Sequence, residues 1–165
     1  MRYASLRSMD ISDGEGVGIS LFVQGCHFHC KNCFNQKTWD FNGGEEFTED
    51  IKEKMFQLLD KPYMVRISIL GGEPLSPPNR QEVRNLCKEI KQKYPQKILW
   101  LYTGYKKEDL CDTDILDYVD VLVDGQYEDD KRNLKLKFRG STNQRIWKKI
   151  EGRWLESQDD IQKPS

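Results

Sequence analysis

Apolar and polar residues form alternating blocks along the chain, and these blocks predict strands and helices in turn. Short apolar runs rich in β-branched and aromatic residues predict buried strands. Longer segments with apolar residues at helical spacing predict two amphipathic helices. The predicted strands are 19–24, 65–70, 98–102 and 120–124, and the predicted helices are 48–60 and 79–94. Because strands and helices alternate, the pattern indicates βαβ units with mostly parallel strands, and therefore an α/β fold.

The segments outside this core pattern are more polar. Residues 1–18 are polar and contain several glycines, and we interpret 12–18 as a turn that leads into the first strand. Residues 106–118 predict a short helix and residues 134–138 a short strand. Residues 146–155 predict a strand or a hairpin. The last segment, 156–165, is polar, and we expect a tail there that follows a single domain spanning 1–155.

Two helix starts have recognisable capping residues. Thr48 precedes Glu49 and Asp50, which suits the N-cap and the positive end of the first helix. In the second helix, Asn79 and Glu82 have the spacing of a cap and its reciprocal partner. Both helices are therefore expected to begin at these positions.

Composition excludes several classes of protein. The net charge of the 165 residues is −1, so nothing favours binding to nucleic acid or to an anionic membrane. No apolar run approaches the length needed to span a bilayer, and Met1–Asp10 lacks the apolar stretch of a signal peptide. Five cysteines, an odd number with three close together, indicate a metal site in a reducing cytoplasm rather than a disulfide framework.

The three clustered cysteines are Cys26, Cys30 and Cys33, in one loop directly after the first predicted strand. A [4Fe–4S] cluster normally takes four cysteines, so three would leave one iron open to another ligand. The alternative is a zinc site with His27 or His29 as the fourth ligand. Otherwise these histidines would support the ligands or contact a partner. Of the other cysteines, Cys87 falls on the apolar stripe of the second helix and predicts a core residue, and Cys111 has no predicted role.

The unusual sequences all follow predicted strands. The cysteine loop follows the first strand, Gly71–Pro74 the second, Thr103–Tyr105 the third and Gly125 the fourth. In parallel α/β folds, ligands bind at the carboxyl ends of strands, so these loops are expected to form one site. The strands are too few to close an eight-stranded barrel. We therefore expect an open, partial (β/α) barrel whose gap admits a large substrate.

Several of these motifs resemble one enzyme superfamily. The cysteine loop resembles the cluster motif of radical S-adenosylmethionine (SAM) enzymes, although Asn32 stands where most members have an aromatic residue. The segment around Asp13 and Gly14 resembles the glycyl-radical activating enzymes. The longer stretches 24–39, 120–125 and 137–145 resemble the activating proteins of anaerobic ribonucleotide reductase. The resemblance implies a barrel of the radical SAM type.

The resemblance also implies a set of cofactor ligands. Cys26, Cys30 and Cys33 would bind three irons of a [4Fe–4S] cluster, and the amino and carboxylate groups of SAM would bind the fourth. Gly72, with Gly71 and Glu73 beside it, would bind the amino group of SAM. Asn32, Cys33 and Phe34 would touch SAM mainly through their main chain. No acid–base catalytic residue is implied.

Arg139 and Arg145 lie in the last of the resembling stretches, and three interpretations stay open for them. Their guanidinium groups match the geometry of a carboxylate, so they are candidates to bind that of SAM. They are equally candidates to bind a partner protein. The third interpretation is solvated charge.

The function that the resemblance implies is activation of anaerobic ribonucleoside-triphosphate reductase. Reductive cleavage of SAM would give a 5′-deoxyadenosyl radical, which would form a glycyl radical on the reductase. A low-potential donor such as flavodoxin or ferredoxin would supply the electron. One alternative is an activase of another glycyl-radical enzyme, such as pyruvate formate-lyase. The other is a non-catalytic adaptor that binds zinc at the same cysteines.

Overall fold

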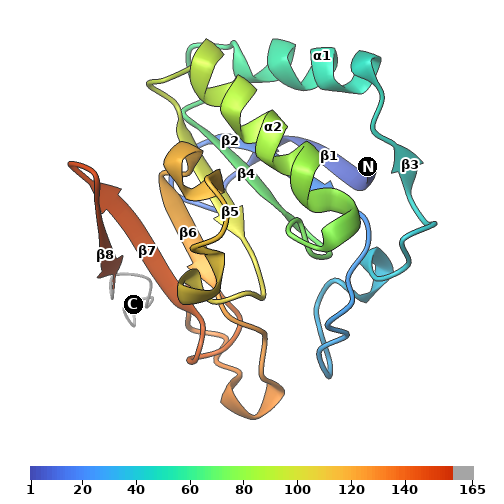
Figure 1. Ribbon diagram of the computed structural model, residues 1–165, viewed down its shortest axis with the longest axis vertical. Coiled ribbons are helices and arrows are strands. Elements are labelled where there is room, and N and C mark those ends of the chain that lie inside the picture. Colours follow the sequence, from blue (N-terminus) through green and yellow to red (C-terminus); the bar gives the residue numbers. More distant parts are fainter. Residues whose placement is uncertain (158–165) are drawn as a thin grey trace.

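The computed structural model describes residues 1–157, and these form a mixed α/β fold around one eight-stranded sheet (Figure 1). The spatial order of the strands is β3-β1-β2-β4-β5-β6-β7-β8. Their bounds are β1 Arg2–Asp10, β2 Gly18–Val23, β3 Glu45–Glu46, β4 Arg66–Gly71, β5 Ile98–Tyr102, β6 Val121–Asp124, β7 Arg145–Ile150 and β8 Arg153–Ser157. The two helices are α1 Glu49–Leu59 and α2 Pro77–Lys93.

Parallel pairing is confined to the centre of the sheet. The strands β2, β4, β5 and β6 pair in parallel, in the order in which the sequence pattern predicts them. The flanking pairs β3–β1, β1–β2, β6–β7 and β7–β8 are antiparallel. The expectation of mostly parallel strands is therefore correct for the four central strands and wrong for the edges of the sheet. Antiparallel neighbours at the edges need no crossover helix to connect them.

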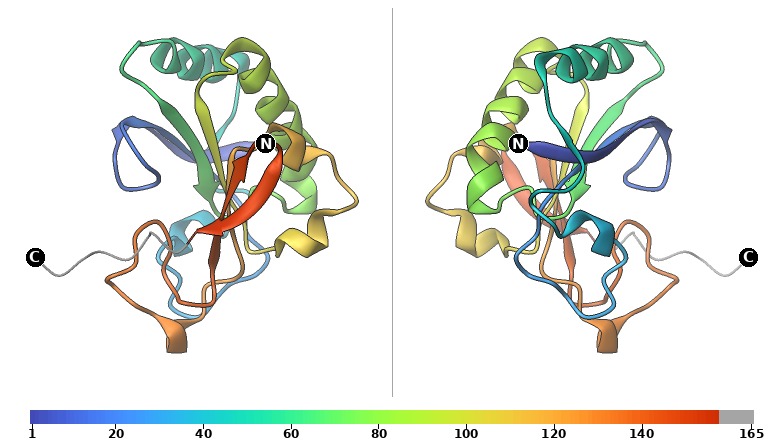
Figure 2. Two further views of the ribbon diagram at one scale, coloured as in Figure 1. Left: turned by 90° about the vertical axis from the view of Figure 1, so that its left-hand side faces the viewer. Right: turned by 90° about the vertical axis from the view of Figure 1, so that its right-hand side faces the viewer.

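One face of the sheet packs against the helices. Alternate residues of the central strands, such as Ile19 in β2, Ile67 in β4 and Leu99 in β5, are fully buried in a core that includes Met55 of α1 and Ile90 of α2. Figure 2 shows both helices on this side of the sheet. Because side chains alternate across a strand, the intervening residues face the other way.

The opposite face carries polar side chains that the segment between β1 and β2 covers. Arg66 of β4 is fully buried there, and its guanidinium donates to the main-chain oxygen of Asp10 at 2.6 Å. It also lies 3.3 Å from an Asp10 carboxylate oxygen. Ser68 and Tyr102 both donate to the main-chain oxygen of Asp13, at 2.7 and 3.0 Å. The N-terminal segment is therefore fastened across the sheet by polar contacts.

The helix starts agree with the sequence in one case only. Thr48 caps α1 as predicted, since its hydroxyl accepts from the main-chain N–H of Ile51. The capping pair predicted for the second helix is wrong, because α2 begins two positions earlier, at Pro77. Proline is favoured in a first helical turn because its missing N–H would have no helical partner there. The side chain of Asn79 instead donates to the main-chain oxygen of Gln24, at 3.1 Å.

Other differences lie at the edges of the sheet. The turn predicted over 12–18 is present between β1 and β2, but neither β1, over Arg2–Asp10, nor β3 was predicted. β1 is mostly exposed and polar, so no apolar run marks it. The expected helix over 106–118 is instead two short 3-10 turns, Lys107–Leu110 and Ile115–Tyr118. No regular element forms over 134–138.

The C-terminal part of the chain is close to its prediction. The hairpin expected over 146–155 is present as β7 and β8. The predicted tail, 156–165, overlaps the end of β8, and residues 158–165 lie outside the described residues. No helix among residues 1–157 is long and apolar enough to cross a membrane.

Replacement of Arg66 tests the polar face. Arg66→Ala would leave Asp10 buried without its cation, which typically costs about 3–5 kcal/mol. The free energy of unfolding, measured by denaturant titration, should fall by about that amount. Arg153→Ala, on the exposed strand β8, is the control and should change it by less than about 0.5 kcal/mol. Equal stabilities of the two variants would contradict this account of the polar face.

Candidate functional site

The cysteine loop begins where β2 ends, and its two limbs are bonded to each other. The N–H of Gly25 donates to the oxygen of Thr38 at 2.6 Å, and the N–H of Cys26 donates to the oxygen of Trp39 at 3.0 Å. Gly25 has a φ of 106° and lies against the ring of Phe41, so a side chain there would meet both strain and overlap. The loop is therefore a closed structure with a fixed base.

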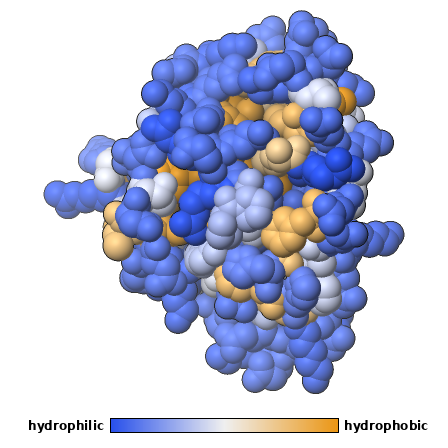
Figure 3. Space-filling view, turned by 45° about the vertical axis from the view of Figure 1, so that its right-hand side comes forward, coloured by the Kyte–Doolittle hydropathy of each residue, from blue (hydrophilic) through white to orange (hydrophobic). Residues whose placement is uncertain are grey.

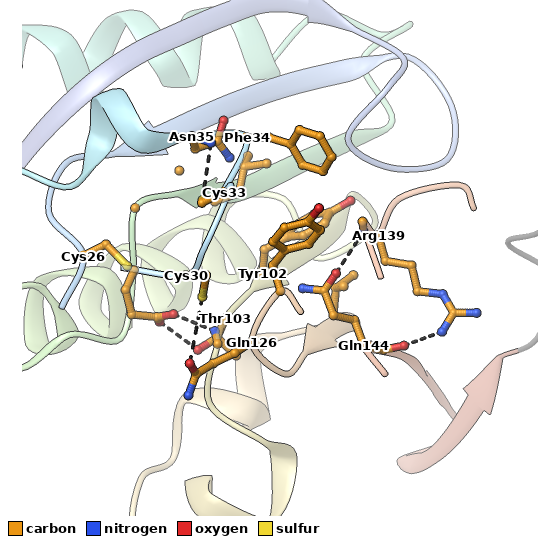
Figure 4. Close-up of a pocket in the computed structure, with 18 of the residues that line it drawn as sticks. Cys26, Cys30, Cys33, Phe34, Asn35, Tyr102, Thr103, Gln126, Arg139 and Gln144 are labelled. Atoms are coloured by element: carbon orange, nitrogen blue, oxygen red, sulfur yellow. Dashed lines mark hydrogen bonds between the residues drawn. The ribbon is translucent and has the colours of Figure 1, made fainter. Parts of the chain in front are cut away.

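Left-handed residues set the path between the cysteines. His29 and Asn32 have φ values of 50° and 54°, a conformation that asparagine adopts more readily than most residues. The N–H of Cys33 donates to the oxygen of Cys30 at 3.1 Å. In Figure 4, Cys26, Cys30 and Cys33 lie on the same side of one cavity. The structure thus brings together the three predicted ligands.

The donor set fits an iron–sulfur cluster. All three cysteines are free thiols; Cys26 is buried, and Cys30 and Cys33 are half-buried. Burial raises the pKa of Cys26 and of Cys30, so positive charge from a metal is needed to stabilise their thiolates. Among residues 1–157, no three His, Cys, Asp or Glu side chains meet closely enough for one metal ion. A cluster has no such requirement, because each thiolate binds a different iron.

The two histidines of the loop do not line this cavity. The ring nitrogens of His27 lie 3.0 Å from the Ser76 hydroxyl and 3.3 Å from the Tyr105 hydroxyl. The ring of His29 stacks on Trp39, with centroids 4.5 Å apart. A zinc site that uses either histidine as the fourth ligand therefore has no support in this arrangement.

The turn after β4 is bonded to the base of the cysteine loop. The N–H of Gly72 donates to the oxygen of Val23 at 2.9 Å, and the N–H of Glu73 donates to the oxygen of Gly25 at 2.7 Å. A side chain on Gly72 would overlap the oxygens of Gly25 and Thr38. The glycine is therefore required for the close approach of these two loops.

The Glu73 carboxylate lies beneath this turn, at 1% exposure. Its oxygens accept from the N–H of Leu75 at 2.8 Å, the hydroxyl of Thr103 at 2.7 Å and the N–H of Gly104 at 2.6 Å. Burial raises its pKa to about 7, although these hydrogen bonds favour the ionised form. The side chain of Glu73 thus joins the loops after β4 and β5. Glu73 lines the cavity, and its contact with SAM stays a prediction.

The cavity has a volume of about 370 Å³, within the usual range for small-molecule sites. The cysteines and Gly71–Glu73 form one end, and Ser12 and Asp13 of the segment covering the polar face form another part of the wall. Figure 4 shows Arg139 and Gln144 on the side opposite the cysteines, with Tyr102 between. Aromatic rings line much of the remaining surface: Phe22, Phe28, Phe34, Tyr102, Tyr127 and Phe138.

Asn32 and Phe34 have different environments. The Asn32 amide donates to an Asp129 carboxylate oxygen at 2.9 Å and does not line the cavity. Phe34 lines the cavity, is 60% exposed and contacts Tyr127 with ring centroids 5.1 Å apart. The cysteine loop is therefore joined to the loop after β6 by one polar and one aromatic contact. Contact of Asn32, Cys33 and Phe34 with SAM through the main chain stays a prediction.

The two arginines left open by the sequence lie in different places. The Arg145 guanidinium donates to Asp124 at 3.0 and 2.5 Å and to Glu108 at 3.0 and 2.8 Å. Asp124 is fully buried, so Arg145 is engaged in an internal ion pair. Arg139 lines the cavity and donates to the main-chain oxygens of Thr142 and Gln144. Of the two, only Arg139 is among the residues that line the cavity, and its guanidinium points away from the cysteines (Figure 4).

Sequence reasoning did not find several residues of the cavity wall. Asp13 was interpreted as part of a turn, although the Asp-Gly-x-Gly resemblance was a signal for it. The Gln126 side chain lies 3.9 Å from the Cys30 sulfur, in the segment after β6, for which the sequence predicted no role. Gln144 and Phe138 reach the cavity from the irregular segment before β7. No periodic pattern marks such residues, so only the three-dimensional structure identifies them.

Comparisons with known proteins agree with this site. The family model described as "4Fe-4S single cluster domain" matches residues 12–147, which include every cavity residue described above. An anaerobic ribonucleoside-triphosphate reductase-activating protein of Enterobacteria phage T4 is 40% identical over 154 residues, covering 93% of this chain and 98% of the relative. The chain belongs to this family. Activating proteins of the same name from Pasteurella multocida (strain Pm70) and Escherichia coli (strain K12) are 38% and 36% identical, over 90% and 87% of this chain and 98% and 96% of theirs.

The activating-protein family is thus represented over nearly the full described chain. These relatives are named as activating proteins of one enzyme, and the 4Fe–4S family model spans the cysteine loop at the end of β2. The range matched by the family model contains Cys26, Cys30 and Cys33.

The Arg145 ion pair can be separated from cofactor binding by mutation. Arg145→Ala should lower the free energy of unfolding by about 3 kcal/mol, because it leaves Asp124 buried and unpaired. Glu108→Ala should cost less than about 1 kcal/mol, because Glu108 is 58% exposed. Denaturant titration of both variants measures the difference. An Arg145→Ala protein of unchanged stability would show that the ion pair does not hold β6 and β7 together.

Proposed function

We propose that this protein activates anaerobic ribonucleoside-triphosphate reductase by generating a glycyl radical on it, as a radical SAM enzyme. The observation that carries the proposal is the placement of three free thiols on one cavity wall, in a chain that belongs to the activating-protein family. When bound, a [4Fe–4S] cluster with SAM on its open iron supplies the electron and the 5′-deoxyadenosyl radical that this reaction needs.

The chain's own contribution is binding, placement and exclusion of water. Cys26, Cys30 and Cys33 would hold three irons, with the closed base of the loop fixing the direction of Cys26. Gly71 and Gly72 expose main chain to the cavity beside the cysteines, which suits an amino group. Glu73 holds this turn against β5. Hydrogen abstraction by a carbon radical needs no general base. The proposed mechanism therefore assigns no acid–base role to any residue.

The remaining SAM contacts would come from the cysteine loop and the far wall. We propose that the main chain of Asn32, Cys33 and Phe34 contacts SAM, in agreement with the position of Phe34 at the cavity surface. Aromatic rings on the wall can stack on the adenine base. Arg139 lines the cavity across from the cysteines, and we keep it as a candidate for the carboxylate.

The architecture suits a protein substrate. We propose that the four parallel strands and the loops at their carboxyl ends form an open, partial (β/α) barrel of the radical SAM type within a single domain over 1–155. The open side of the cavity would be closed by the reductase, which would bring its glycine to the radical. A low-potential donor, flavodoxin or ferredoxin, would supply the electron, and the three unprotected thiols suit a reducing cytoplasm.

Two alternatives make different predictions. An activase of another glycyl-radical enzyme would show the same SAM chemistry, but the names of the relatives favour the reductase. A zinc adaptor would need a fourth ligand, and the two histidines of the loop face elsewhere. The discriminating measurement is the release of 5′-deoxyadenosine from SAM and dithionite, followed by the glycyl-radical signal of the reductase in electron paramagnetic resonance.

Each cysteine ligand should be required. After anaerobic reconstitution with iron and sulfide, Cys30→Ala should lose the brown colour of the cluster and at least about a hundredfold in 5′-deoxyadenosine release, because one iron loses its ligand. Cys87→Ala is the matched control, since Cys87 is fully buried in the core and should cost only packing stability. A Cys30→Ala protein with normal product release would refute the mechanism.

The turn after β4 should be required for SAM binding. Gly72→Ala places a methyl group against the oxygens of Gly25 and Thr38, so the turn must move away from the cysteine loop. The dissociation constant of SAM, measured by equilibrium dialysis on the reconstituted protein, should rise by about tenfold or more. Gly152→Ala is the control: with a φ of 79° it strains the turn between β7 and β8, but the added atom has nothing within 4 Å and the turn is not part of the cavity. Unchanged SAM affinity in Gly72→Ala would show that the turn after β4 is not required for SAM binding.

A further inference from the structure

The segment after β6 reaches the cysteine loop beside one of its three thiols, that of Cys30. The Cys30 sulfur lies 3.9 Å from the side-chain oxygen of Gln126, and Figure 4 marks this contact with a dashed line. Burial and then the charges of Cys33 and Cys26 raise the pKa of Cys30, whereas a hydrogen bond from the main chain of Tyr127 lowers it. Two consecutive residues from a distant part of the chain therefore present polar groups to this sulfur.

The position of Gln126 is fixed by hydrogen bonds of the main chain around it. The N–H of Gly125 donates to the oxygen of Tyr105 at 3.2 Å, and the oxygen of Gly125 accepts from the side-chain amide of Gln144 at 3.0 Å. The oxygen of Gln126 itself accepts from the side-chain amide of Asn143 at 2.8 Å. These bonds come from the loop after β5 and from the segment before β7, so the Gln126 side chain starts from a fixed place on the cavity wall.

The stem of the Gln126 side chain lies over Gly104. A Cβ added to Gly104 would be 3.3 Å from the Cγ of Gln126. Gln126 is exposed, and exposed amides on a hydrophilic surface such as that in Figure 3 mostly bond to water. The fixed main chain and the contact with Gly104 hold this amide beside the Cys30 sulfur instead.

A thiol and a metal-bound thiolate need opposite hydrogen-bond partners. The Cys30 thiol has a proton to donate, and in the structure it faces the amide oxygen of Gln126. When the sulfur binds iron, the thiol has lost its proton and can only accept. A glutamine amide serves both states, because it has an acceptor at one end and two donors at the other, and a half-turn exchanges them. Gln126 can therefore donate an N–H to the sulfur of the bound ligand.

We propose that Gln126 is a positioning residue for the redox chemistry, which acts through Cys30 and raises the reduction potential of the cluster. The inference rests on the [4Fe–4S] cluster of the proposed function and deepens it. Hydrogen bonds to the sulfurs are among the factors that set cluster potentials. Because reduction adds a negative charge, a donor stabilises the reduced cluster more than the oxidised one. Gln126 thus makes the cluster easier to reduce before SAM is cleaved.

Gln126→Leu tests the proposal, since leucine occupies the same wall without a donor. The protein is reconstituted anaerobically with iron and sulfide and titrated with dithionite and redox mediators in the absence of SAM. The equilibrium constant for reduction should fall about tenfold, which is a midpoint potential about 59 mV lower for a one-electron couple. The electron paramagnetic resonance signal of the reduced cluster measures it. Gln57→Leu, at an exposed position of α1, is the matched control and should keep the wild-type potential.

Gln126→Glu is the second variant, because a carboxylate has nearly the same shape but only accepts. It also places negative charge beside the sulfur, so its potential should fall at least as far as that of Gln126→Leu. Equal potentials in the wild type, Gln126→Leu and Gln57→Leu would overturn the proposal, and so would an unchanged or higher potential in Gln126→Glu. Weaker SAM binding without any change in potential would also overturn it, because Gln126 would then act on SAM. If Gln126→Leu takes up no cluster, Gln126→Glu decides.

The potential separates this inference from the proposed function, because it is measured without SAM. The proposed function is measured by 5′-deoxyadenosine release with SAM and dithionite. A lowered potential in Gln126→Leu, together with a wild type that releases no product, would support the role of Gln126 and refute the radical SAM reaction. Product release with unchanged potentials would do the reverse. A wild type that assembles no [4Fe–4S] cluster would refute both.

Discussion

The site depends on a small set of main-chain hydrogen bonds around Gly25. Its N–H binds the returning limb of the cysteine loop at Thr38, and its oxygen accepts from the N–H of Glu73 in the turn after β4. The cysteine loop after β2 and the turn after β4 are therefore joined through hydrogen bonds to this one residue. A left-handed glycine is needed there, because the ring of Phe41 occupies the space of a side chain. The direction of Cys26, the next residue, follows from this junction.

The Glu73 carboxylate extends the same junction to a third strand. It is buried, and its three hydrogen bonds come from groups in the turns after β4 and β5. Burial of a carboxylate is costly, and these donors offset the cost. The sheet thus positions the reactive end of the molecule through polar contacts between loops, whereas the helix side of the sheet contributes stability through its apolar core.

The sequence predicted the parts of the fold that have a regular apolar pattern. β2, β4, β5 and β6 are buried runs, and α1 and α2 carry apolar stripes, so periodicity identified them. β1 did not follow such a pattern, because it is an outer strand whose residues mostly face solvent. The cysteines were identified by spacing alone. Glu73 was identified for its place in a motif, but its partners Thr103 and Gly104 lie a strand away, and local sequence holds no information about that contact.

The walls of the cavity differ in how far apart their residues are in the sequence. The three thiols come from one short loop, whereas the contacts Asn32–Asp129 and Cys30–Gln126 join residues 97 and 96 positions apart. Closing such long loops carries an entropic cost that local contacts avoid. The wall formed by the segment after β6 is therefore held to the cysteine loop by contacts that are costly in entropy, whereas the spacing of the three thiols is set within one short loop.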